Sequence, residues 1–312
     1  MKIDTQQEFT KVVMPTSSST LLKWAKRIFT PLALGFIIYF AWQSRNILAT
    51  LIANAQPDFL ILAVFFLIIV HFVAPASVVM ILKACGSSIS YSFALKTHIN
   101  RLPARYLPGG IWHTVGRTMD FYQQGIKPVH LTTFVLLENI MAASTAFIIG
   151  GISVWYFRGI TDIWGKIAVI GCLCSILGLS LAPKILNWQI LKSVSQVHYR
   201  FYLQTIAIYI LIWFLLTFAF ITYLSAFLAL GEISMLEVGG IYIFSWGIGF
   251  IAIFAPQGIG IFEMVAGNML NAPLSLGNIA VLLAGFRVIT LIADMSIWSL
   301  KRLVYLSRFR NH

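Results

Sequence analysis

Residues 59–82 read FLILAVFFLIIVHFVAPASVVMIL, an apolar run without a single Lys, Arg, Asp or Glu. About 20 such residues are enough for a helix to cross the hydrocarbon core of a bilayer. The rest of the 312-residue chain has the same character, because 59% of its residues are hydrophobic, 10% are charged and the mean hydropathy is +0.86. A soluble domain carries about 25% charged residues. The sequence therefore predicts an all-α integral membrane protein.

Further apolar runs bring the number of predicted spanning helices to about six. The runs cover residues 28–48, 59–82, 131–157, 166–183, 203–230 and 277–300. Two other regions, 88–127 and 236–275, are interrupted by proline and glycine. The last arm of the second region has about 14 residues and measures about 21 Å as a helix, which is too short to cross.

The distribution of basic residues predicts how the chain is oriented. With a cytoplasmic N-terminus, 18 Lys and Arg residues lie on the inner side, and three (Arg45, Arg158 and Lys166) lie outside. This bias requires both interrupted regions to return to the side from which they entered, so we predict two re-entrant hairpins and cytoplasmic termini. The net charge of +12 is divided among short runs between apolar segments, which argues against nucleic acid as a partner.

The two halves of the chain follow the same order of helix, helix, hairpin and helix, and the second half starts on the opposite side. This order predicts inverted repeats over residues 24–158 and 163–305 within one transmembrane domain, 24–305. Residues 1–23 and 306–312 are expected to be cytoplasmic tails. The hairpin tips share the pattern aromatic-x-Pro-x-Gly-Ile, in Tyr106-Leu-Pro108-Gly-Gly110-Ile and Phe254-Ala-Pro256-Gln-Gly258-Ile. Paired interruptions in corresponding positions point to a transporter site.

The proline and glycine residues explain how each tip is formed. Proline ends a helix and glycine permits the turn. Non-helical backbone is tolerated within the membrane only where protein buries it or where it lines a polar cavity. Helices that start just after Gly110 and Gly258 would direct free amide groups at an anion. The alternative is that each break is an ordinary turn at the surface.

Ionisable residues inside apolar sequence are costly, and they indicate either a site or a structural ion pair. Arg287 lies well inside the last span and needs a carboxylate or an anionic ligand, and Glu263 is the candidate partner. We expect Asp294 and Arg117 to reach a membrane interface. We expect His71 to hydrogen-bond between helices, and the alternative is that it relays protons. A substrate site and ion pairs that only hold helices together both remain open.

At the two tips the sequence resembles the transmembrane flippase-like superfamily that is named after lysylphosphatidylglycerol synthase. The residues that carry the resemblance are Arg105-Tyr-Leu-Pro108-Gly109-Gly110-Ile-Trp112, Gly116-Arg117, Pro256-Gln-Gly258-Ile-Gly260-Ile-Phe-Glu263 and Arg287. It covers residues from about 25 to 305. The resemblance implies a multi-pass protein of the bacterial inner (plasma) membrane that flips an aminoacylated or other anionic lipid, or a polyprenyl-linked intermediate.

The resemblance has two limits. Some members of the superfamily carry a soluble aminoacyl transferase domain that these residues lack, so lysyl transfer is not implied. The second tip of the family is commonly Pro-Gly-Gly, whereas this chain has Gln257 in the middle position. This departure leaves the substrate more open than the fold.

The leading hypothesis is a flippase-like transporter of an anionic phospholipid or a polyprenyl-phosphate-linked lipid, with no cofactor. Its predicted substrate-binding residues are Arg105, Pro108, Gly109, Gly110, His113, Arg117, Glu138, Pro256, Gly258, Gly260, Glu263 and Arg287. The alternative is a non-catalytic membrane partner of lipid or glycan biosynthesis enzymes. An intramembrane enzyme is not expected, because the sequence contains no His-x-x-x-His or Gly-x-Ser-x-Gly motif and its three cysteines lack metal-site spacing.

Overall fold

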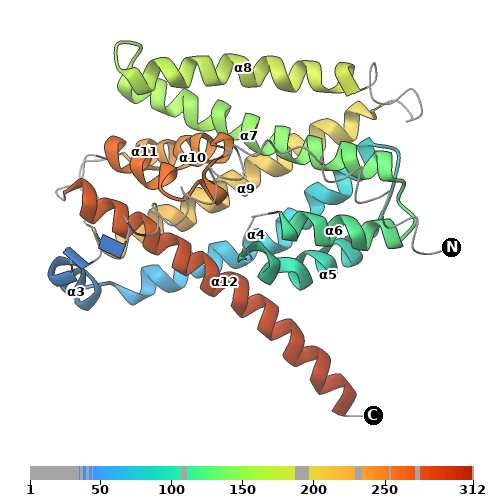
Figure 1. The fold of residues 1–312 in the computed structure, drawn as a ribbon, viewed down its shortest axis with the longest axis horizontal. Coiled ribbons are helices and arrows are strands. Elements are labelled where there is room, and N and C mark those ends of the chain that lie inside the picture. Colours follow the sequence, from blue (N-terminus) through green and yellow to red (C-terminus); the bar gives the residue numbers. More distant parts are fainter. Residues whose placement is uncertain are drawn as a thin grey trace.

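The protein is helical throughout the part of the chain that the computed structural model describes, namely residues 45–106, 111–186, 197–228, 234–252, 254–270 and 275–310 and five positions between 35 and 43. Figure 1 shows the arrangement of the helices, and no β-strand occurs in these ranges. The elements are α3 (Arg45–Ala53), α4 (Pro57–Ala84), α5 (Tyr91–Arg101), η1 (Leu102–Tyr106), α6 (Trp112–Gln123), α7 (Pro128–Arg158), α8 (Ile163–Ile185), α9 (Tyr199–Ser225), α10 (Met235–Ile251), η3 (Pro256–Gly258), α11 (Ile261–Met269) and α12 (Leu276–Arg310).

Five of the described helices are long and apolar enough to cross a membrane: α4, α7, α8, α9 and the Gly277–Leu303 part of α12. Four predicted spans, 59–82, 131–157, 166–183 and 277–300, fall within one of these helices each. The predicted span 203–230 extends too far, because α9 ends at Ser225. The predicted span 28–48 lies largely outside the described residues. The chain is therefore a multi-pass membrane protein.

Local sequence explains where several helices begin. Pro57 and Pro128 occupy the first turns of α4 and α7, where the missing N–H of proline costs no hydrogen bond. The Asp162 carboxylate caps α8 by accepting from the backbone N–H of Trp164 at 2.8 Å. Ser234 caps α10 in the same way. These caps separate the long apolar runs into distinct helices.

Both proline-glycine regions form two short helices that flank a break. In the first, α5 has 11 residues and α6 has 12, and η1 follows α5 directly. Pro108, Gly109 and Gly110 of the first tip lie outside the described residues. In the second, α10 has 17 residues and α11 has 9, and the break contains the single 3₁₀ turn η3. None of these four helices matches the length of the spanning helices.

The second tip depends on backbone conformations that favour glycine. Gly258 and Gly260 have φ of 67° and 85°, and Gln257 between the helices has φ of 55°. A Cβ atom on Gly258 would lie 2.9 Å from the backbone of Gly249 in α10. The tip therefore folds tightly against the end of α10, which explains two of the glycines predicted to shape it.

The helices pack in a few dominant pairs. α4 runs along α9, and α7 contacts both α8 and α10, with α8 on the outer edge of the bundle (Figure 1). Glycine allows α7 and α10 to approach closely, because a Cβ atom on Gly150 would lie 2.5 Å from the backbone nitrogen of Phe244. A Cβ atom on Gly240 of α10 would likewise overlap Ser153 of α7. Small residues serve the same purpose in other membrane bundles.

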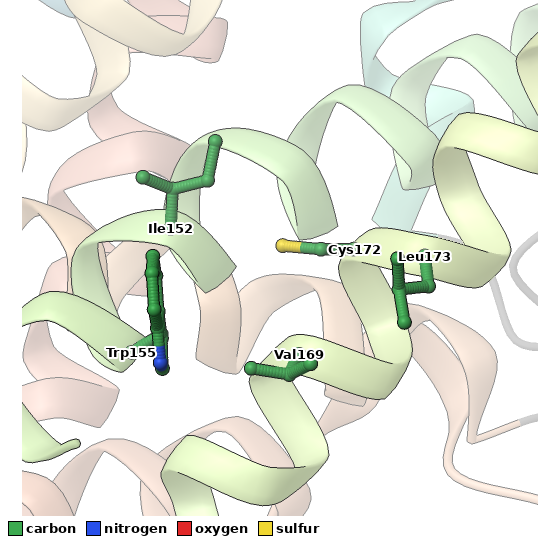
Figure 2. Close-up of a pocket in the computed structure, with 5 residues that line it drawn as sticks. All are labelled: Ile152, Trp155, Val169, Cys172 and Leu173. Carbon is green, nitrogen blue, oxygen red and sulfur yellow. The ribbon is translucent and has the colours of Figure 1, made fainter. Parts of the chain in front are cut away.

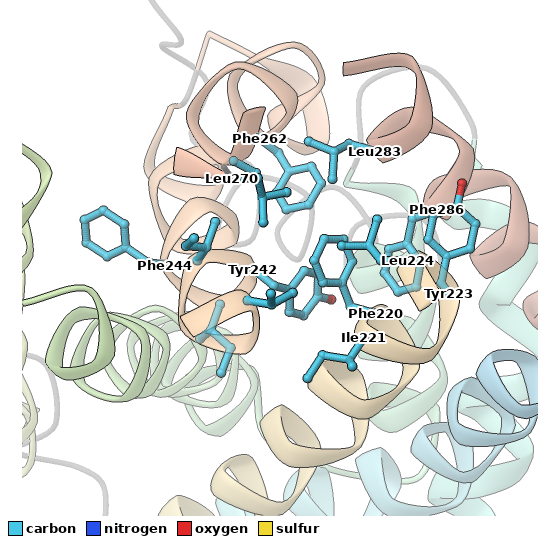
Figure 3. Close-up of a cluster of buried hydrophobic side chains, with 14 of the residues drawn as sticks. Phe220, Ile221, Tyr223, Leu224, Tyr242, Phe244, Phe262, Leu270, Leu283 and Phe286 are labelled. Atoms are coloured by element: carbon cyan, nitrogen blue, oxygen red, sulfur yellow. The ribbon is translucent and has the colours of Figure 1, made fainter. Parts of the chain in front are cut away.

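An aromatic cluster holds the second proline-glycine region against the spanning helices (Figure 3). Phe220 of α9 stacks on Tyr242 of α10 with ring centroids 4.5 Å apart. It also meets Phe286 of α12 edge-on at 5.2 Å, while Tyr242 meets Phe262 of α11 at 5.9 Å. Edge-to-face pairs add to the packing because the positive ring edge meets the negative face. The cluster fixes α10 and α11 between α9 and α12.

Candidate functional site

The second tip is joined to α12 by an ion pair whose carboxylate is buried. Arg287 Nε donates to Glu263 Oε1 at 2.6 Å, and the side chain of Glu263 is only 2% exposed. Glu263 Oε2 accepts from the backbone N–H of Gly260 at 2.7 Å. Arg287 Nη1 also donates to the carbonyl of Gln257 at 3.1 Å. The predicted pairing of Arg287 with Glu263 is confirmed, and the Glu263 carboxylate uses an amide at the start of α11 that we expected to face an anion.

The two proline-glycine regions meet at their tips. The Gln257 side chain in the second tip donates through Nε2 to the backbone carbonyl of Arg105 in the first. Because the Gln257 carbonyl also accepts from Arg287, one residue joins both arginines. We call Arg105, Gln257 and Arg287 the tip joint. Arg105 and Arg287 have 36% and 32% of their side chains exposed, so both remain accessible from outside the bundle.

Asp294 of α12 ties the first tip to the bundle. Its Oδ2 accepts from Arg105 Nη1 at 3.0 Å and from the Tyr106 hydroxyl at 2.9 Å. Its Oδ1 lies 2.8 Å from His71 Nε2. The side chain is 0% exposed, so the expectation that Asp294 reaches a membrane interface is wrong. The carboxylate is stable at this depth because three polar side chains surround it.

A second buried ion pair fastens α6 to α7. Arg117 Nη1 and Nη2 donate to Glu138 Oε1 and Oε2 at 3.0 and 2.7 Å, the two-pronged geometry that guanidinium favours. Arg117 is 5% exposed, so the expectation that it reaches an interface is also wrong. Its guanidinium lies 5.6 Å from the Phe134 ring centroid. Arg117 is thus enclosed inside the bundle, unlike the two arginines of the tip joint, and its Nε atom is buried without a hydrogen-bond partner among the described residues.

Three histidines from α4, α5 and α6 form a buried cluster beside these pairs. His71 Nδ1 lies 3.1 Å from His98 Nε2, and the His98 and His113 rings meet edge-on at 5.6 Å. We call these three residues the histidine cluster. His98 Nδ1 and His113 Nε2 are buried and have no hydrogen-bond partner among the described residues. The expected hydrogen bond of His71 between helices is confirmed.

The histidine cluster does not have the geometry of a metal site. Within the described ranges, no three His, Cys, Asp or Glu side chains are arranged so that they could hold a metal ion. The cluster instead lies between Asp294, which His71 contacts at 2.8 Å, and helix α6, which carries both His113 and Arg117. Its buried nitrogen atoms can therefore donate, accept or carry protons.

Sequence reasoning brought some of these residues together and missed others. The structure groups five predicted residues into the tip joint and the two ion pairs, namely Arg105, Arg117, Glu138, Glu263 and Arg287. It places His113 next to them. The predicted binding set did not include His71, His98, Tyr106, Gln257 and Asp294, although all of these except His98 were noted in the sequence. An acidic residue in the apolar sequence of the last span was the available signal for Asp294.

A cavity on the outer side of the bundle is a separate feature. It has a volume of about 200 Å³ and lies between α7 and α8, lined by Ile152, Trp155, Val169, Cys172 and Leu173 (Figure 2). Ile152, Trp155 and Leu173 are each about half exposed or more. None of the predicted binding residues lines this cavity, and its apolar walls offer no partner for a charged headgroup.

Comparisons with known proteins identify no family for this chain, so its function is interpreted from the structure. A scan against protein-family models gives no match, and a search of curated proteins finds no significant relative.

Proposed function

We propose that the protein is a flippase-like carrier that moves an anionic phospholipid or a polyprenyl-phosphate-linked lipid across a bacterial inner membrane. The observation that carries the proposal is the tip joint, where two broken helical segments from different halves of the chain meet beside two accessible arginines. Broken segments that meet in this way hold the substrate in many secondary transporters.

Helix packing supports an inverted repeat with two re-entrant hairpins. If the halves correspond, α4 matches α9, α5 matches α10, α6 matches α11 and α7 matches α12. The contacts then occur in matching pairs: α4 with α5 and α9 with α10, α6 with α7 and α11 with α12, and α7 with α10 and α12 with α5. The matching helices α4 and α9 pack against each other, as expected beside a pseudo-two-fold axis.

The ion pairs follow the same correspondence. In the first half, Arg117 on the second arm of the hairpin pairs with Glu138 on the next spanning helix. In the second half, Glu263 on the second arm pairs with Arg287 on the next spanning helix. The arginine and the carboxylate exchange positions between the two halves, while the pair consists of a second hairpin arm and the next spanning helix in both. This exchange supports hairpins that move as units with the helices that follow them.

The tip joint has the chemistry for an acidic headgroup. Arg105 and Arg287 each carry a positive charge that one carboxylate neutralises in this state. A phosphate group can replace either carboxylate as a guanidinium partner, because its oxygens fit the same planar fork. Such an exchange would release the tips from Asp294 and Glu263. The headgroup then crosses between the two halves while the lipid tails stay in the bilayer.

Reconstitution tests this proposal directly. Purified protein in phosphatidylcholine vesicles is given tail-labelled phosphatidylglycerol, and transfer between leaflets is followed by chemical quenching of the outer label. We expect transfer by the wild type and loss of transfer in Arg287→Ala. Arg101→Ala is the matched control, because Arg101 forms a partly exposed pair with Asp120 and none of the contacts of the tip joint.

The result that would contradict the proposal is unchanged transfer in a folded Arg287→Ala variant. Transfer of phosphatidylcholine at the same rate as phosphatidylglycerol would also contradict it, because the arginines would then contribute no selectivity. Folding of each variant is checked by its thermal unfolding profile. Mass spectrometry of lipids that co-purify with the wild type and are lost in Arg105→Ala would identify the natural headgroup.

A second candidate function is that of a non-catalytic partner for a lipid or glycan synthesis complex. The observation that favours it is that Arg105, Arg117 and Arg287 all pair with carboxylates of the chain itself. Charges that only hold helices together would be paired in this way. Absence of transfer in vesicles, together with co-purification of a biosynthetic enzyme, would favour this function.

A further inference from the structure

A buried chain of hydrogen-bonding groups runs from α12 through α4 to α5. Asp294 Oδ1 lies 2.8 Å from His71 Nε2, and His71 Nδ1 lies 3.1 Å from His98 Nε2. All three side chains are nearly inaccessible, with exposures of 0% for Asp294, 5% for His71 and 4% for His98. Buried groups joined in this way can pass a proton by exchanging hydrogen bonds.

The His71–His98 hydrogen bond and the His71–Asp294 contact, which is an ion-pair contact and not a formed hydrogen bond in this structure, together determine which nitrogen atoms carry protons. A charged Asp294 only accepts, so His71 carries its proton on Nε2 and accepts through Nδ1. His98 must then donate through Nε2, which leaves its Nδ1 as an unprotonated, basic nitrogen. This Nδ1 atom is buried and has no hydrogen-bond partner among the described residues. The chain therefore ends in a buried lone pair on His98, which is the group to which we assign the incoming proton.

We propose that the chain from His98 through His71 to Asp294 takes up one proton, and that its arrival frees Arg105 to bind an anionic headgroup, so that lipid transfer is coupled to proton entry. The inference rests on the proposed function and adds its energy source. The proton binds His98 Nδ1, the His98 Nε2 proton passes to His71 Nδ1, and the His71 Nε2 proton passes to Asp294 Oδ1. One proton enters, and one neutral carboxyl group results.

The surrounding charges make proton and anion binding favour each other. The groups around the chain are Arg105 and Tyr106 of η1, His113 and Arg117 of α6, and Glu138 of α7, which pairs with Arg117. At rest, Arg105 and Arg117 balance Asp294 and Glu138, and burial keeps His98 neutral. One added proton leaves a net charge of +1 beside the tip joint. An anionic headgroup at Arg105 would cancel that charge.

The electrostatics of His98 agree with this coupling. Burial lowers the pKa of His98 well below its usual value, and the neighbouring His71, Arg117 and Arg105 lower it further. His98 is therefore neutral at rest. An anion bound to Arg105 offsets part of the positive field and raises the affinity of the chain for a proton. By linkage, the proton raises the affinity for the anion by the same factor.

A pH gradient across the vesicles tests the inference. Transfer of tail-labelled phosphatidylglycerol is compared at symmetric pH and with a gradient of one unit. At one proton per lipid, the gradient shifts the leaflet distribution about tenfold toward the alkaline side. We expect His98→Asn to lose this shift. His130→Asn is the matched control and should keep it, because His130 bonds to Ser87 outside the chain.

A second measurement does not depend on transfer or on any variant. Short-chain phosphatidylglycerol is added to wild-type protein in weakly buffered detergent with a pH-sensitive dye, and we expect uptake of protons on binding.

Two results of the gradient experiment would overturn the coupling. The first is a wild-type leaflet distribution that does not change with the pH gradient, and the second is a His98→Asn variant that responds to the gradient as His130→Asn does. If the wild type does not transfer lipid even at symmetric pH, the proposed function fails. The dye measurement then decides alone, and absent uptake overturns the coupling.

Discussion

Gln257 offers a sharp test of the tip joint, because one substitution removes the contact between the tips and another removes it together with backbone strain. Gln257 has φ of 55°, in the left-handed region, where a residue with a Cβ atom is disfavoured by about 1–2 kcal/mol. Its side chain donates to Arg105, and a hydrogen bond of this kind contributes about 1 kcal/mol. The bond from Arg287 to the Gln257 carbonyl does not depend on the side chain.

The two variants should therefore differ in stability. Gln257→Ala loses the hydrogen bond and keeps the strain, so we expect it to be about 1 kcal/mol less stable than the wild type. Gln257→Gly loses the same bond but relieves the strain. The greater conformational freedom of glycine in the unfolded chain lowers the stability of this variant by about 0.5–1 kcal/mol. At the middle of these ranges, its free energy of unfolding should lie about 0.3 kcal/mol below that of the wild type, and so closer to the wild type than that of Gln257→Ala.

Reversible unfolding in mixed micelles measures both free energies, and the lipid-transfer assay measures the function of the tip joint. We expect both variants to change the transfer rate to the same extent, because both lose the contact with Arg105. Equal destabilisation of the two variants would refute the assignment of strain at Gln257. Wild-type transfer in both would refute a role for the contact between the tips.

Three further predictions concern the packing and the ion pairs. Gly150→Val should destabilise the protein by about 1–3 kcal/mol, because the new side chain meets the backbone of α10, whereas Gly178→Ala has room and should cost little; thermal unfolding compares them. Arg117→Ala should lower the free energy of unfolding by about 3–5 kcal/mol, because it leaves the Glu138 carboxylate inside the bundle without its partner. An equal loss of stability in a double variant that also carries Glu138→Gln would contradict this account. Arg101→Ala removes a partly exposed pair and should cost about 1 kcal/mol, less than Arg117→Ala, in the same measurement.

The positions of the long helices could be predicted from the sequence because each residue of a lipid-facing helix must itself be compatible with lipid. The predicted span 59–82 falls inside α4, which begins at Pro57 and ends at Ala84. Each residue there contributes to burial in lipid regardless of its neighbours, so a sum along the chain locates the helix. The end of α9 was predicted five residues too late because apolar residues continue past Ser225, where the helix nevertheless stops.

The candidate site was harder to predict because it depends on how helices face one another. Arg287 and Glu263 lie on consecutive elements, so only a short connection had to be inferred. Asp294 meets Arg105 from a position 189 residues away, and nothing in either local sequence specifies that meeting. His98 lies in the first predicted hairpin region, but the sequence alone does not show that its ring meets His71 of α4, where packing buries it. Rotation of each helix about its axis determined these contacts.

The lengths of α7 and α12 also bear on the kind of membrane in which the protein works. A helix of 31 residues such as α7 measures about 46 Å, and the apolar part of α12 measures about 40 Å, whereas the hydrocarbon core is about 30 Å thick. Both helices must lean away from the bilayer normal or stretch the lipid around them. Because α12 holds Asp294 and Arg287, a change in acyl-chain length would alter the angle at which it presents both groups to the tips. The lipid composition of the host bilayer would therefore affect how the protein positions these two side chains.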